Sequence, residues 1–513
     1  MLQVQNLTIH INKDYRTIVD NLSFIIDYND KFAIIGIEGS GKSTLLKAIF
    51  NHELLPYCQI SGKIIKQGKI GYLEQSISDT WKDTSVYDFL LKDYPDSEIT
   101  IDDYQKLGNL DKYLSKLKID PKIFDEHKSV MQYSGGELVK LGIIKILINE
   151  PDIILLDEPT NDLDLETILF LEEFILNEER PILFVSHDEA LLENVSNGII
   201  YLSQIHKRSK PLHEVAKMNY HDYKEYRKLA LDSQEMIAKK QRSDFQKKIE
   251  RFRQIYSKVE YQQNQAVRNP GLGRLLKKKI HALKSMEKRL SKEKEKFLDI
   301  PEREEAINIF FDKDICIPNN KTVLDLHIKP LKIGDRVLAK EINLMVKGGS
   351  KIAIIGKNGS GKSTLLKYIY ENLKDRHDLS VGYMSQKYEE LMTDEYSALE
   401  YLLKDLNNKD EATIRKMMGA LQFTRDEMNN KTNSLSGGQK AKLLLLKMVI
   451  NKNNVLLLDE PTRNLSPLSA PVIHELLSSF KGCVICVTHD RKFLENVFED
   501  IYELTKEKLL KLT

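Results

Sequence analysis

The chain has 513 residues, of which 41% are hydrophobic and 30% are charged, and its formal net charge is +1. This length is sufficient for about three domains that each bury a core. No stretch approaches the roughly 18 consecutive apolar residues that a membrane-spanning helix requires, and the first residues do not resemble a secretion signal. The four cysteines are too scattered for a disulfide framework. We therefore expect a soluble cytoplasmic protein.

The glycine-rich stretch GIEGSGKST occupies residues 36–44, directly after an apolar run. The stretch GKNGSGKST at residues 356–364 repeats the pattern. In such a turn between a strand and a helix, backbone N–H groups surround phosphates at the positive helix N-terminus. The lysine reaches the β- and γ-phosphates, and the serine after it offers a hydroxyl to Mg²⁺. Two copies in matched contexts predict two nucleotide sites. The candidate nucleotide-binding residues are Gly36, Gly39, Ser40, Gly41, Lys42, Ser43, Thr44, Gly356, Gly359, Ser360, Gly361, Lys362, Ser363 and Thr364.

The same order of motifs continues after both loops. A glutamine ends the motif YLEQ at Gln75 and the motif YMSQ at Gln386, and an SGG motif begins at Ser134 and at Ser436. Each half then has an apolar run ending in DEPT and, further on, a His-Asp pair. These motifs place Asp157, Glu158 and His187 in the first half, and Asp459, Glu460 and His489 in the second. The sequence therefore predicts a duplicated domain.

The acidic pair at the end of each apolar run suits nucleotide hydrolysis. The first carboxylate, Asp157 or Asp459, is placed to hold Mg²⁺. The second, Glu158 or Glu460, is placed to polarise the water that attacks the γ-phosphate. We therefore interpret the two glutamates as the catalytic bases.

This ordered set of motifs resembles the ATP-binding cassette family, and the resemblance covers both halves of the chain. It implies an α/β fold with two tandem P-loop ATP-binding cassette domains, an ATPase activity, and ATP and Mg²⁺ as ligands. The glutamines would sense the metal and the attacking water, and His187 and His489 would contact the γ-phosphate. The implied metal sites are Ser43, Gln75 and Asp157 in the first half, and Ser363, Gln386 and Asp459 in the second.

In this family the two domains close head to tail, so that the SGG helix of one domain covers the nucleotide of the other. Backbone donors and a hydroxyl at a helix start suit the γ-phosphate anion. Closure of the two domains would therefore depend on the γ-phosphate, and hydrolysis would let the domains open. The implied pairs are Lys42 with Ser436, Gly437 and Gly438, and Lys362 with Ser134, Gly135 and Gly136.

The segment between the two halves is strongly basic. Residues 206–296 contain 26 Lys and Arg but only 11 Asp and Glu. Two stretches, near 223–260 and 274–297, have a helical composition, and turn formers lie between them. We therefore expect a helical hairpin with its tip near 262–273. Its predicted apolar seam consists of Phe245, Ile249, Phe252, Ile255 and Val259, and of Leu276, Ile280, Leu283 and Met286.

These features divide the chain into three predicted domains. The first cassette occupies residues 1–205, the basic hairpin linker occupies 206–322, and the second cassette occupies 323–513. The charges of the linker have two interpretations. They could form the solvated surface of a coiled coil, but their imbalance favours binding to phosphate groups.

A basic hairpin between two cassettes is similar to the ABC-F proteins, which are translation factors and resistance proteins of the ribosome. The resemblance implies that the ATP-closed chain enters the tRNA exit site of the bacterial 70S ribosome. There the hairpin would contact 23S ribosomal RNA and the peptidyl tRNA, recognising shape and backbone. It also implies a monomer whose cassettes pair within one chain. The candidate RNA-binding residues are Gln265, Val267, Arg268, Asn269, Leu272, Arg274, Lys277, Lys278, Lys279 and Lys284.

The stretch EPTRNLSPLS at residues 460–469 resembles the ABC-F subgroup that protects ribosomes against lincosamides, pleuromutilins and streptogramin A compounds. Ser466 stands there where the first half has Asp164. We therefore favour the displacement of antibiotics from the peptidyl transferase centre, with release of the protein on ATP hydrolysis, and a housekeeping translation factor is the alternative. An energy subunit of a transporter would have no long basic linker. In a DNA-repair ATPase the coiled coil would interrupt one cassette.

The two predicted sites differ in sequence. Tyr15 precedes the first phosphate loop and could stack on adenine, whereas the aligned residue in the second half is Asp335. The first SGG motif is followed by Glu137 and the second by Gln439. We therefore expect two unequal nucleotide sites.

Overall fold

The computed structural model describes residues 1–12, 15–124, 128–205, 210–265, 270–301, 310–312, 314–392, 395–404 and 411–512. The chain divides into two compact units. One consists of Met1–Tyr220 together with Glu304–Thr513, and the other is His221–Arg303. The first unit contains both halves of the sequence repeat, and the second contains the basic helical segment.

Each half of the first unit is built on a six-stranded sheet, and the two sheets have the same strand order. Five strands of each sheet are parallel, and the last is antiparallel to its neighbour. The first sheet runs β5 (Ile70–Leu73), β6 (Ile153–Asp157), β7 (Ile182–Val185), β3 (Lys31–Ile35), β8 (Gly198–Ile205) and β9 (Lys210–Ala216). The second runs β15 (Val381–Met384), β16 (Val455–Asp459), β17 (Cys483–Val487), β14 (Lys351–Ile355), β18 (Asp500–Leu504) and β19 (Leu509–Lys511). The matching order confirms the predicted duplicated α/β fold.

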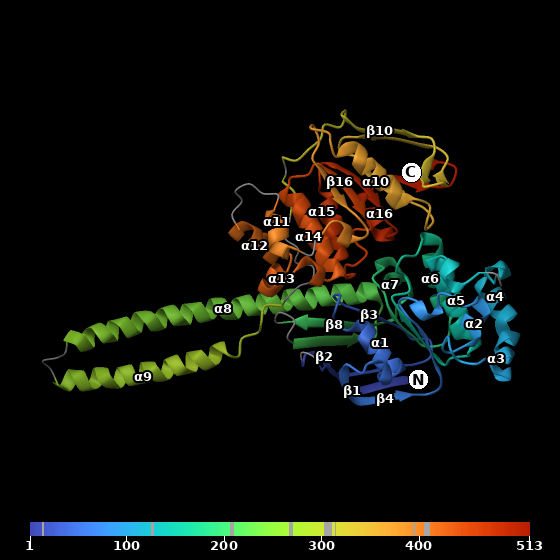
Figure 1. Ribbon diagram of the computed structural model, residues 1–513. Helices are drawn as coiled ribbons and strands as arrows, with labels where there is room; N and C mark the ends of the chain where they lie inside the picture. Colours follow the sequence, from blue (N-terminus) through green and yellow to red (C-terminus); the bar gives the residue numbers. More distant parts are fainter. Residues whose placement is uncertain are drawn as a thin grey trace. The chain divides into compact units, whose positions relative to one another are not determined.

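The central strands are apolar along their whole length because helices and sheets cover both of their faces. β6 reads IILLD and β16 reads VLLLD, and every residue of both strands is buried. α1 (Lys42–Phe50) packs on β6, and α10 (Lys362–Leu373) packs on β16 and β17 (Figure 1). Since parallel strands end at one edge of a sheet, each phosphate loop and each acidic pair emerge at the same edge.

Smaller antiparallel sheets precede the phosphate loops. In the first half, β1 (Leu2–Ile11) lies between β2 (Thr17–Ile26) and β4 (Cys58–Lys66). In the second half, β10 (Thr322–Ile328) pairs with β13 (Ile342–Lys347), and β11 (Leu331–Ile333) pairs with β12 (Arg336–Ala339). β9 follows the boundary that the sequence suggests at residue 205, yet it pairs with β8 and completes the first sheet.

Further helices surround each sheet. Those of the first half are α2 (Val86–Leu91), α3 (Ile101–Lys106), α4 (Leu110–Leu117), α5 (Gly135–Ile148), α6 (Leu165–Asn177) and α7 (Glu189–Val195). Those of the second are α11 (Ala398–Leu403), α12 (Glu411–Ala420), α13 (Arg425–Asn429), α14 (Gly437–Ile450), α15 (Ala470–Ser478) and α16 (Arg491–Val497). Within the described residues, none of the helices is long and apolar enough to cross a membrane.

The second unit is a pair of long helices that lie side by side (Figure 1). α8 (Tyr220–Gln265) has 46 residues and is therefore about 69 Å long. α9 (Pro270–Lys294) begins at a proline, which is favoured in the first turn of a helix because its missing N–H has no helical partner there. Both helices extend into the expected tip region at 262–273, and only residues 266–269, which lie outside the described part, separate them.

An apolar seam joins the two helices. Val259, Leu276 and Leu283 are buried against one another, and Phe252, Tyr256 and Ile280 pack beside them. The prediction that Ile255 and Met286 belong to this seam is wrong, because they are 49% and 40% exposed. Residues 245, 249, 252, 256 and 259 alternate steps of four and three, which is the spacing of paired helices, so Tyr256 takes the place expected for Ile255.

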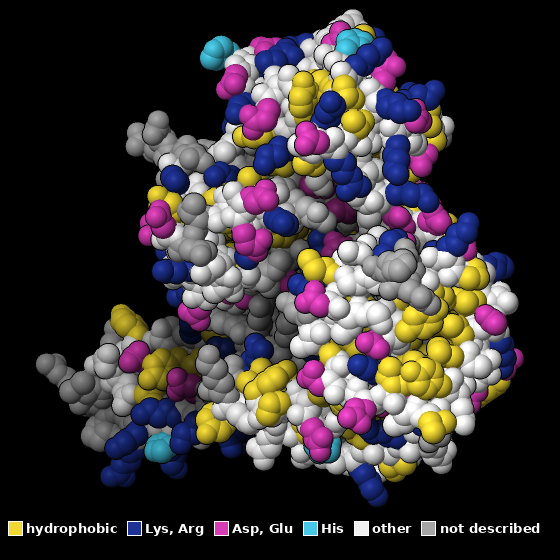
Figure 2. All heavy atoms as spheres, turned by 45° about the vertical axis from the view of Figure 1, so that its right-hand side comes forward, with side chains coloured by type: hydrophobic (Ala, Val, Ile, Leu, Met, Phe, Trp, Pro, Cys, Tyr) yellow, Lys and Arg dark blue, Asp and Glu magenta, His cyan; other side chains and the backbone are white. Residues whose placement is uncertain are grey.

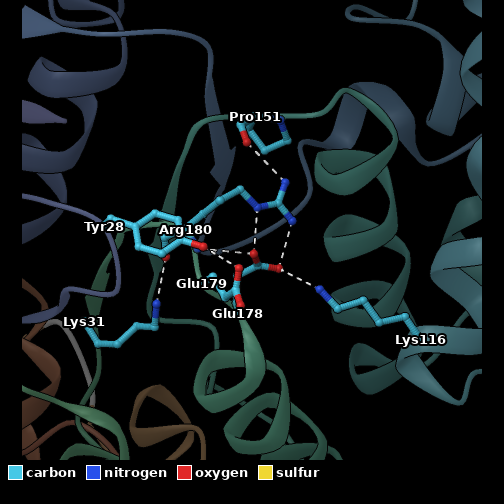
Figure 3. Close-up of polar contacts among 7 residues, drawn as sticks. All are labelled: Tyr28, Lys31, Lys116, Pro151, Glu178, Glu179 and Arg180. Atoms are coloured by element: carbon cyan, nitrogen blue, oxygen red, sulfur yellow. Dashed lines mark hydrogen bonds and ion pairs between the residues drawn. The ribbon is translucent and has the colours of Figure 1, made fainter.

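A buried ion pair lies in the segment between α6 and β7 of the first half (Figure 3). The Glu178 side chain is only 4% exposed, and it accepts hydrogen bonds from Nε and Nη2 of Arg180 at 2.7 and 2.8 Å. Arg180 also donates to the Pro151 carbonyl, and Lys116 of α4 lies 3.3 Å from Glu178. Burial favours the protonated acid, but the hydrogen bonds and charge of Arg180 outweigh it and lower the pKa of Glu178 to about 2.

We expect Arg180→Ala to lower the free energy of unfolding by about 3–5 kcal/mol, because Glu178 would stay buried without its bidentate partner. The matched control is Glu173→Ala, which removes an exposed ion pair with Lys118 and should change stability by about 0.5 kcal/mol or less. Unfolding of both variants by heat or urea makes the comparison. Equal losses would contradict the role of the buried pair.

The same pair predicts a pH dependence of stability. The pKa of Glu178 lies below its ordinary value of 4.5 in the folded chain, so its ionised form stabilises the fold above that pH. The stabilisation should shrink as the pH falls from 4.5 towards 2. The difference between the wild type and Arg180→Ala, measured across this range, should shrink with it.

Candidate functional site

The two phosphate loops require glycine at the positions where the chain turns tightly. Gly36 has a φ of 145°, and an added Cβ would lie 1.9 Å from the carbonyl oxygen of Leu202. Gly356 repeats this geometry, with a φ of 144° and the Leu504 carbonyl oxygen at 2.6 Å. The glycine pattern in the sequence thus reflects close contact between the loop and the neighbouring strand.

Each loop holds polar groups that an anion would satisfy. The Oγ atoms of Ser40 and Ser360 are buried and have no hydrogen-bond partner. Lys42 Nζ donates to the Gly36 carbonyl at 3.0 Å, and Lys362 Nζ donates to the Gly356 carbonyl at 2.7 Å. Burial lowers the pKa of Lys362. Buried hydroxyls and ammonium groups at a helix N-terminus fit a phosphate chain.

A serine and an aspartate meet beside each loop. Ser43 Oγ donates to Asp157 at 2.8 Å, and Tyr72 donates to the other Asp157 oxygen at 3.1 Å. Ser363 hydrogen-bonds to Asp459 in the same way. Burial raises the pKa of both aspartates. These hard oxygen donors fit Mg²⁺ bridged to a phosphate.

The glutamates that follow the aspartates share a strained backbone. Glu158 and Glu460 have φ values of 46° and 49°, in the left-handed region that side chains rarely adopt. Such strain persists where the surrounding fold imposes it, often at functional sites. Both glutamates therefore lie at the edge of their sheet with the same backbone conformation.

The surroundings of the two glutamates differ. Glu158 accepts hydrogen bonds from Gln75 at 2.9 Å and Asn161 at 2.6 Å, and His187 Nε2 lies 3.3 Å away. Burial favours the protonated acid, but His187, Lys42 and Asn161 outweigh it and lower the pKa of Glu158 to about 2. This carboxylate is therefore ionised and held in place.

Among the described contacts, Glu460 has no side-chain hydrogen-bond donor and accepts only from the backbone of His489. His489 Nε2 lies 3.8 Å away, and both ring nitrogens of His489 are buried without a hydrogen bond. Burial raises the pKa of Glu460 to about 8 and lowers that of His489 to about 4. The expected inequality of the two sites is therefore visible in the partners of their acidic groups.

The halves of the first unit contact each other at both loops. The Gly438 N–H donates to the Glu38 carboxylate at 2.8 Å, so the second SGG motif reaches the first phosphate loop. At the second loop, Asn358 donates to the carbonyl oxygen of Asp162. Within the described residues, no hydrogen bond joins Ser134, Gly135 or Gly136 to that loop. Among the described contacts, an SGG motif thus reaches the phosphate loop of the other half at the first loop and not at the second.

A cavity of about 530 Å³ lies over the second loop and is lined by both halves. Ile333, Arg336 and Leu338 of the β11–β12 hairpin line it together with Lys362. Sequence reasoning did not single out these three residues, although two of them flank Asp335 closely. Tyr15, the predicted adenine contact of the first site, is 87% exposed with a φ of 51°.

Sequence reasoning also missed the residues that join the halves, namely Glu38, Asp162, Asn358 and Arg463. The sequence could have indicated these residues only by their positions. Glu38 and Asn358 lie inside the phosphate loops, and Asp162 and Arg463 follow the DEPT motifs. Their partners were not predictable, because each contact joins residues that are far apart in the chain.

The predicted RNA-binding residues lie in the hairpin unit. Arg274, Lys277, Lys278, Lys279 and Lys284 are exposed on α9, and Figure 2 shows Lys and Arg side chains gathered on this part of the molecule, at the lower left. Gln265 ends α8 and Leu272 lies in the first turn of α9. Val267, Arg268 and Asn269 lie outside the described residues.

We expect Gly36→Ala to impair the first loop far more than Gly39→Ala. The added methyl group at Gly36 would overlap the Leu202 carbonyl, whereas at Gly39 it would meet no atom within 4 Å. We expect Gly39→Ala to lower the free energy of unfolding by about 1 kcal/mol, because of its left-handed φ. Gly36→Ala should lower it by about 3 kcal/mol, because of overpacking. Thermal unfolding and titration with a fluorescent ATP analogue measure both effects. Similar losses in the two variants would show that the contact with Leu202 is unimportant.

Comparisons with known proteins agree with this geometry. A family model described as ABC transporter matches residues 19–161 and 339–463. The ATP-binding protein Uup of Buchnera aphidicola is 31% identical over 492 residues, covering 93% of this chain and 76% of that protein. ABC transporter F family member 5 of Arabidopsis thaliana is 27% identical over 542 residues, covering 96% of this chain and 74% of that protein.

A solved structure shares the fold of the whole chain. It is the archaeal ribosome recycling factor aABCE1 in complex with the ribosomal stalk protein aP1, with a TM-score of 0.57 and 16% identity. The match covers 98% of this chain and 89% of that one. At this level of identity the likeness concerns the fold.

Proposed function

This chain belongs to the ABC-F family of ATP-binding cassette proteins and is an ATPase, and we propose that it uses ATP to act on the bacterial ribosome. The observation that carries the proposal is a strongly basic helical hairpin between two complete cassettes. A cassette pair that only energised a membrane transporter would have no use for such a hairpin.

Each cassette carries the groups that ATP hydrolysis needs. Lys42 and Lys362 bind the β- and γ-phosphates within their loops. Bound Mg²⁺ would neutralise phosphate charge, and a serine, a glutamine and an aspartate of each cassette would hold it. Glu158 and Glu460 orient the attacking water, while His187 and His489 face the γ-phosphate.

Closure of the cassettes would follow from the same groups. The Gly438 N–H already donates to a carboxylate of the first phosphate loop, which marks it as a donor for an anion at that site. A γ-phosphate on Lys42 would take this donor and draw the cassettes together. Its departure on hydrolysis would remove the interaction and open them.

The hairpin would be the part that contacts RNA. Lys277, Lys278 and Lys279 are exposed on α9, and none of them forms an ion pair with a described residue. Cations without local partners gain free energy by displacing counterions from a phosphate backbone. The length of α8, about 69 Å, lets such a hairpin reach into a narrow site. The similar archaeal structure is of a ribosome recycling factor, which also favours a ribosomal role.

Within this role, we favour displacement of antibiotics from the peptidyl transferase centre of the bacterial ribosome. The argument is the resemblance of residues 460–469 to the resistance subgroup. Asp164 caps α6 by accepting from Thr167, whereas Ser466 bonds to Ser469 and α15 begins only at Ala470. The loops after the two DEPT motifs therefore differ in conformation. The alternative is a housekeeping factor that acts on the peptidyl tRNA without affecting drugs.

We expect the double variant Glu158→Gln, Glu460→Gln to bind ATP, to hydrolyse it at least about 100-fold more slowly, and to stay on ribosomes. Co-sedimentation with bacterial 70S ribosomes in ATP and in ADP measures this. Pelleting should occur in ATP and not in ADP, because closure requires the γ-phosphate. Failure to pellet in either nucleotide would overturn the ribosomal function.

The same tubes distinguish the two ribosomal roles. A radiolabelled lincosamide and a pleuromutilin are bound to the ribosomes before the variant is added. Release of the drugs into the supernatant supports antibiotic displacement. Pelleting without drug release supports the housekeeping factor.

We expect replacement of Lys277, Lys278 and Lys279 by Gln to weaken ribosome binding and to flatten its salt dependence. Removal of one lysine–phosphate interaction should reduce the slope of log K against log salt by about 0.7 to 0.9, so removal of all three should reduce it by about two to three. The matched control replaces Lys239, Lys247 and Lys248, which already pair with acidic residues of the hairpin. An unchanged slope in the first variant, or an equal change in the control, would contradict RNA binding by this surface.

A further inference from the structure

The imidazole ring of His489 has no hydrogen bond of its own to hold it in place. Among the described contacts, both of its ring nitrogens are buried without a partner, and Nε2 lies 3.8 Å from Glu460. In the first cassette, Nε2 of His187 lies closer to its glutamate, at 3.3 Å from Glu158. The position of the His489 ring over the second phosphate loop therefore depends on the backbone that carries it.

The next residue, Asp490, anchors this backbone at the start of α16. Its Oδ1 accepts a hydrogen bond from the Phe493 N–H at 3.0 Å and so caps the helix. Its own N–H donates to Thr488 Oγ1 at 3.1 Å. Its Oδ2 accepts from Oγ1 of Thr462, the last residue of the DEPT motif, at 3.0 Å. The carboxylate of Asp490 thus joins the start of α16 to the end of β16.

A buried histidine of α15 is a further partner of this carboxylate. The His474 side chain is 4% exposed, and its Nε2 lies 3.3 Å from Oδ2 of Asp490. Its ring stacks on Phe493 at a centroid distance of 4.8 Å. Burial favours the protonated acid, but the hydrogen bond and the charge of His474 outweigh it and lower the pKa of Asp490. The described residues that line the cavity over the second loop include His489 and Asp490 but not His474.

The first cassette has no such histidine. Glu172 of α6 stands at the same distance from its DEPT motif as His474 does in the second half. Glu172 accepts a hydrogen bond from Asn194 at 2.7 Å and pairs with Arg491 at 2.7 Å. Arg491 lies 3.6 Å from Asp188, which is beyond hydrogen-bond distance. The support of the aspartate by a histidine of its own cassette is therefore particular to the second half.

We propose that His474 is a positioning residue for the second ATP site, where it places His489 against the γ-phosphate by holding Asp490 at the start of α16. Without the imidazole, Thr462 would be the remaining side-chain partner of Oδ2 among the described contacts. The start of α16 would then be free to shift, and His489 would shift with it. The role of His489 at the γ-phosphate belongs to the proposed function, on which this inference rests.

The measurable consequence is a loss of discrimination between ATP and ADP. A histidine that contacts the γ-phosphate stabilises bound ATP, whereas ADP has no γ-phosphate. Displacement of His489 should therefore weaken the binding of ATP and leave the binding of ADP unchanged. A general disturbance of the fold would weaken both nucleotides alike. The ratio of the two affinities separates a positioning role from a merely structural one.

The experiment uses the full chain with Lys42→Ala, so that fluorescent ADP and a fluorescent, non-hydrolysable ATP analogue report the second site alone. We expect His474→Phe, which keeps a ring against Phe493 but removes the nitrogen donor, to lower the ratio of ATP to ADP affinity. The expected factor is about three to ten, which corresponds to one hydrogen bond. His474→Gln restores a donor and should recover most of the ratio. An unchanged ratio in His474→Phe, or a ratio no higher in His474→Gln, overturns the proposal.

Phe498→Leu is the matched control for packing. Phe498 contacts the other ring neighbour of His474, Phe493, edge-on at a centroid distance of 4.9 Å. The substitution alters the packing of α16 but removes no partner of Asp490, so the ratio should stay unchanged. A loss as large as that in His474→Phe overturns the proposal, because the ratio would then follow the packing of the helix.

A last pair of variants tests whether His474 acts through His489. In a chain that carries His489→Ala, the substitution His474→Phe should no longer change the ratio, and an effect of the same size there overturns the proposal. His489→Ala by itself should lower the ratio, and its failure to do so would refute the γ-phosphate contact in the proposed function. A lowered ratio in His489→Ala with none in His474→Phe would refute this inference alone.

Discussion

The main physical constraint on the first unit is that buried carboxylates must lie beside the sites where negatively charged phosphates would bind. Asp157 and Asp459 end strands in which every residue is buried, and burial raises the pKa of both groups. Each is stabilised by a serine hydroxyl and by the charge of a nearby lysine, which is Lys47 for Asp157 and Lys362 for Asp459. The parallel sheet makes this possible, because it brings the ends of separate strands to one edge. A Mg²⁺ ion and a phosphate chain would complete the balance of charge at this edge.

Duplication gave the two sites the same motifs, but their neighbours make them different. Gln75 and Asn161 hold the first glutamate, so that it is ionised and oriented. The second glutamate has no side-chain donor among the described contacts, only the backbone of His489, and burial raises its pKa to about 8. The difference arises where the halves meet, since one side contributes the Gly438 N–H and the other the Asp162 carboxylate. Two copies of the same order of motifs can therefore form sites whose acidic groups have different partners.

In the hairpin unit, the residues that hold the two helices together differ from the exposed lysines near its tip. Its seam, centred on Val259, Leu276 and Leu283, holds the two helices together. Ion pairs such as Lys248 with Glu293 add to this on the surface. The lysines at 277–279 are exposed, and they form no ion pair with a described residue. The partner that we propose for this exposed charge is a phosphate backbone.

The sequence by itself determined the duplicated α/β fold, both phosphate loops, the acidic pairs and the existence of a helical hairpin. Glycine spacing and apolar runs are local signals, so they can be interpreted without knowing what packs against them. The seam was predictable only in part, because assigning Ile255 or Tyr256 to it requires the register of the partner helix. Tertiary structure alone decided the roles of Asp162, Arg463 and Glu38. Their interactions join residues hundreds of positions apart, and no local pattern specifies which donor a carboxylate will meet across an interface.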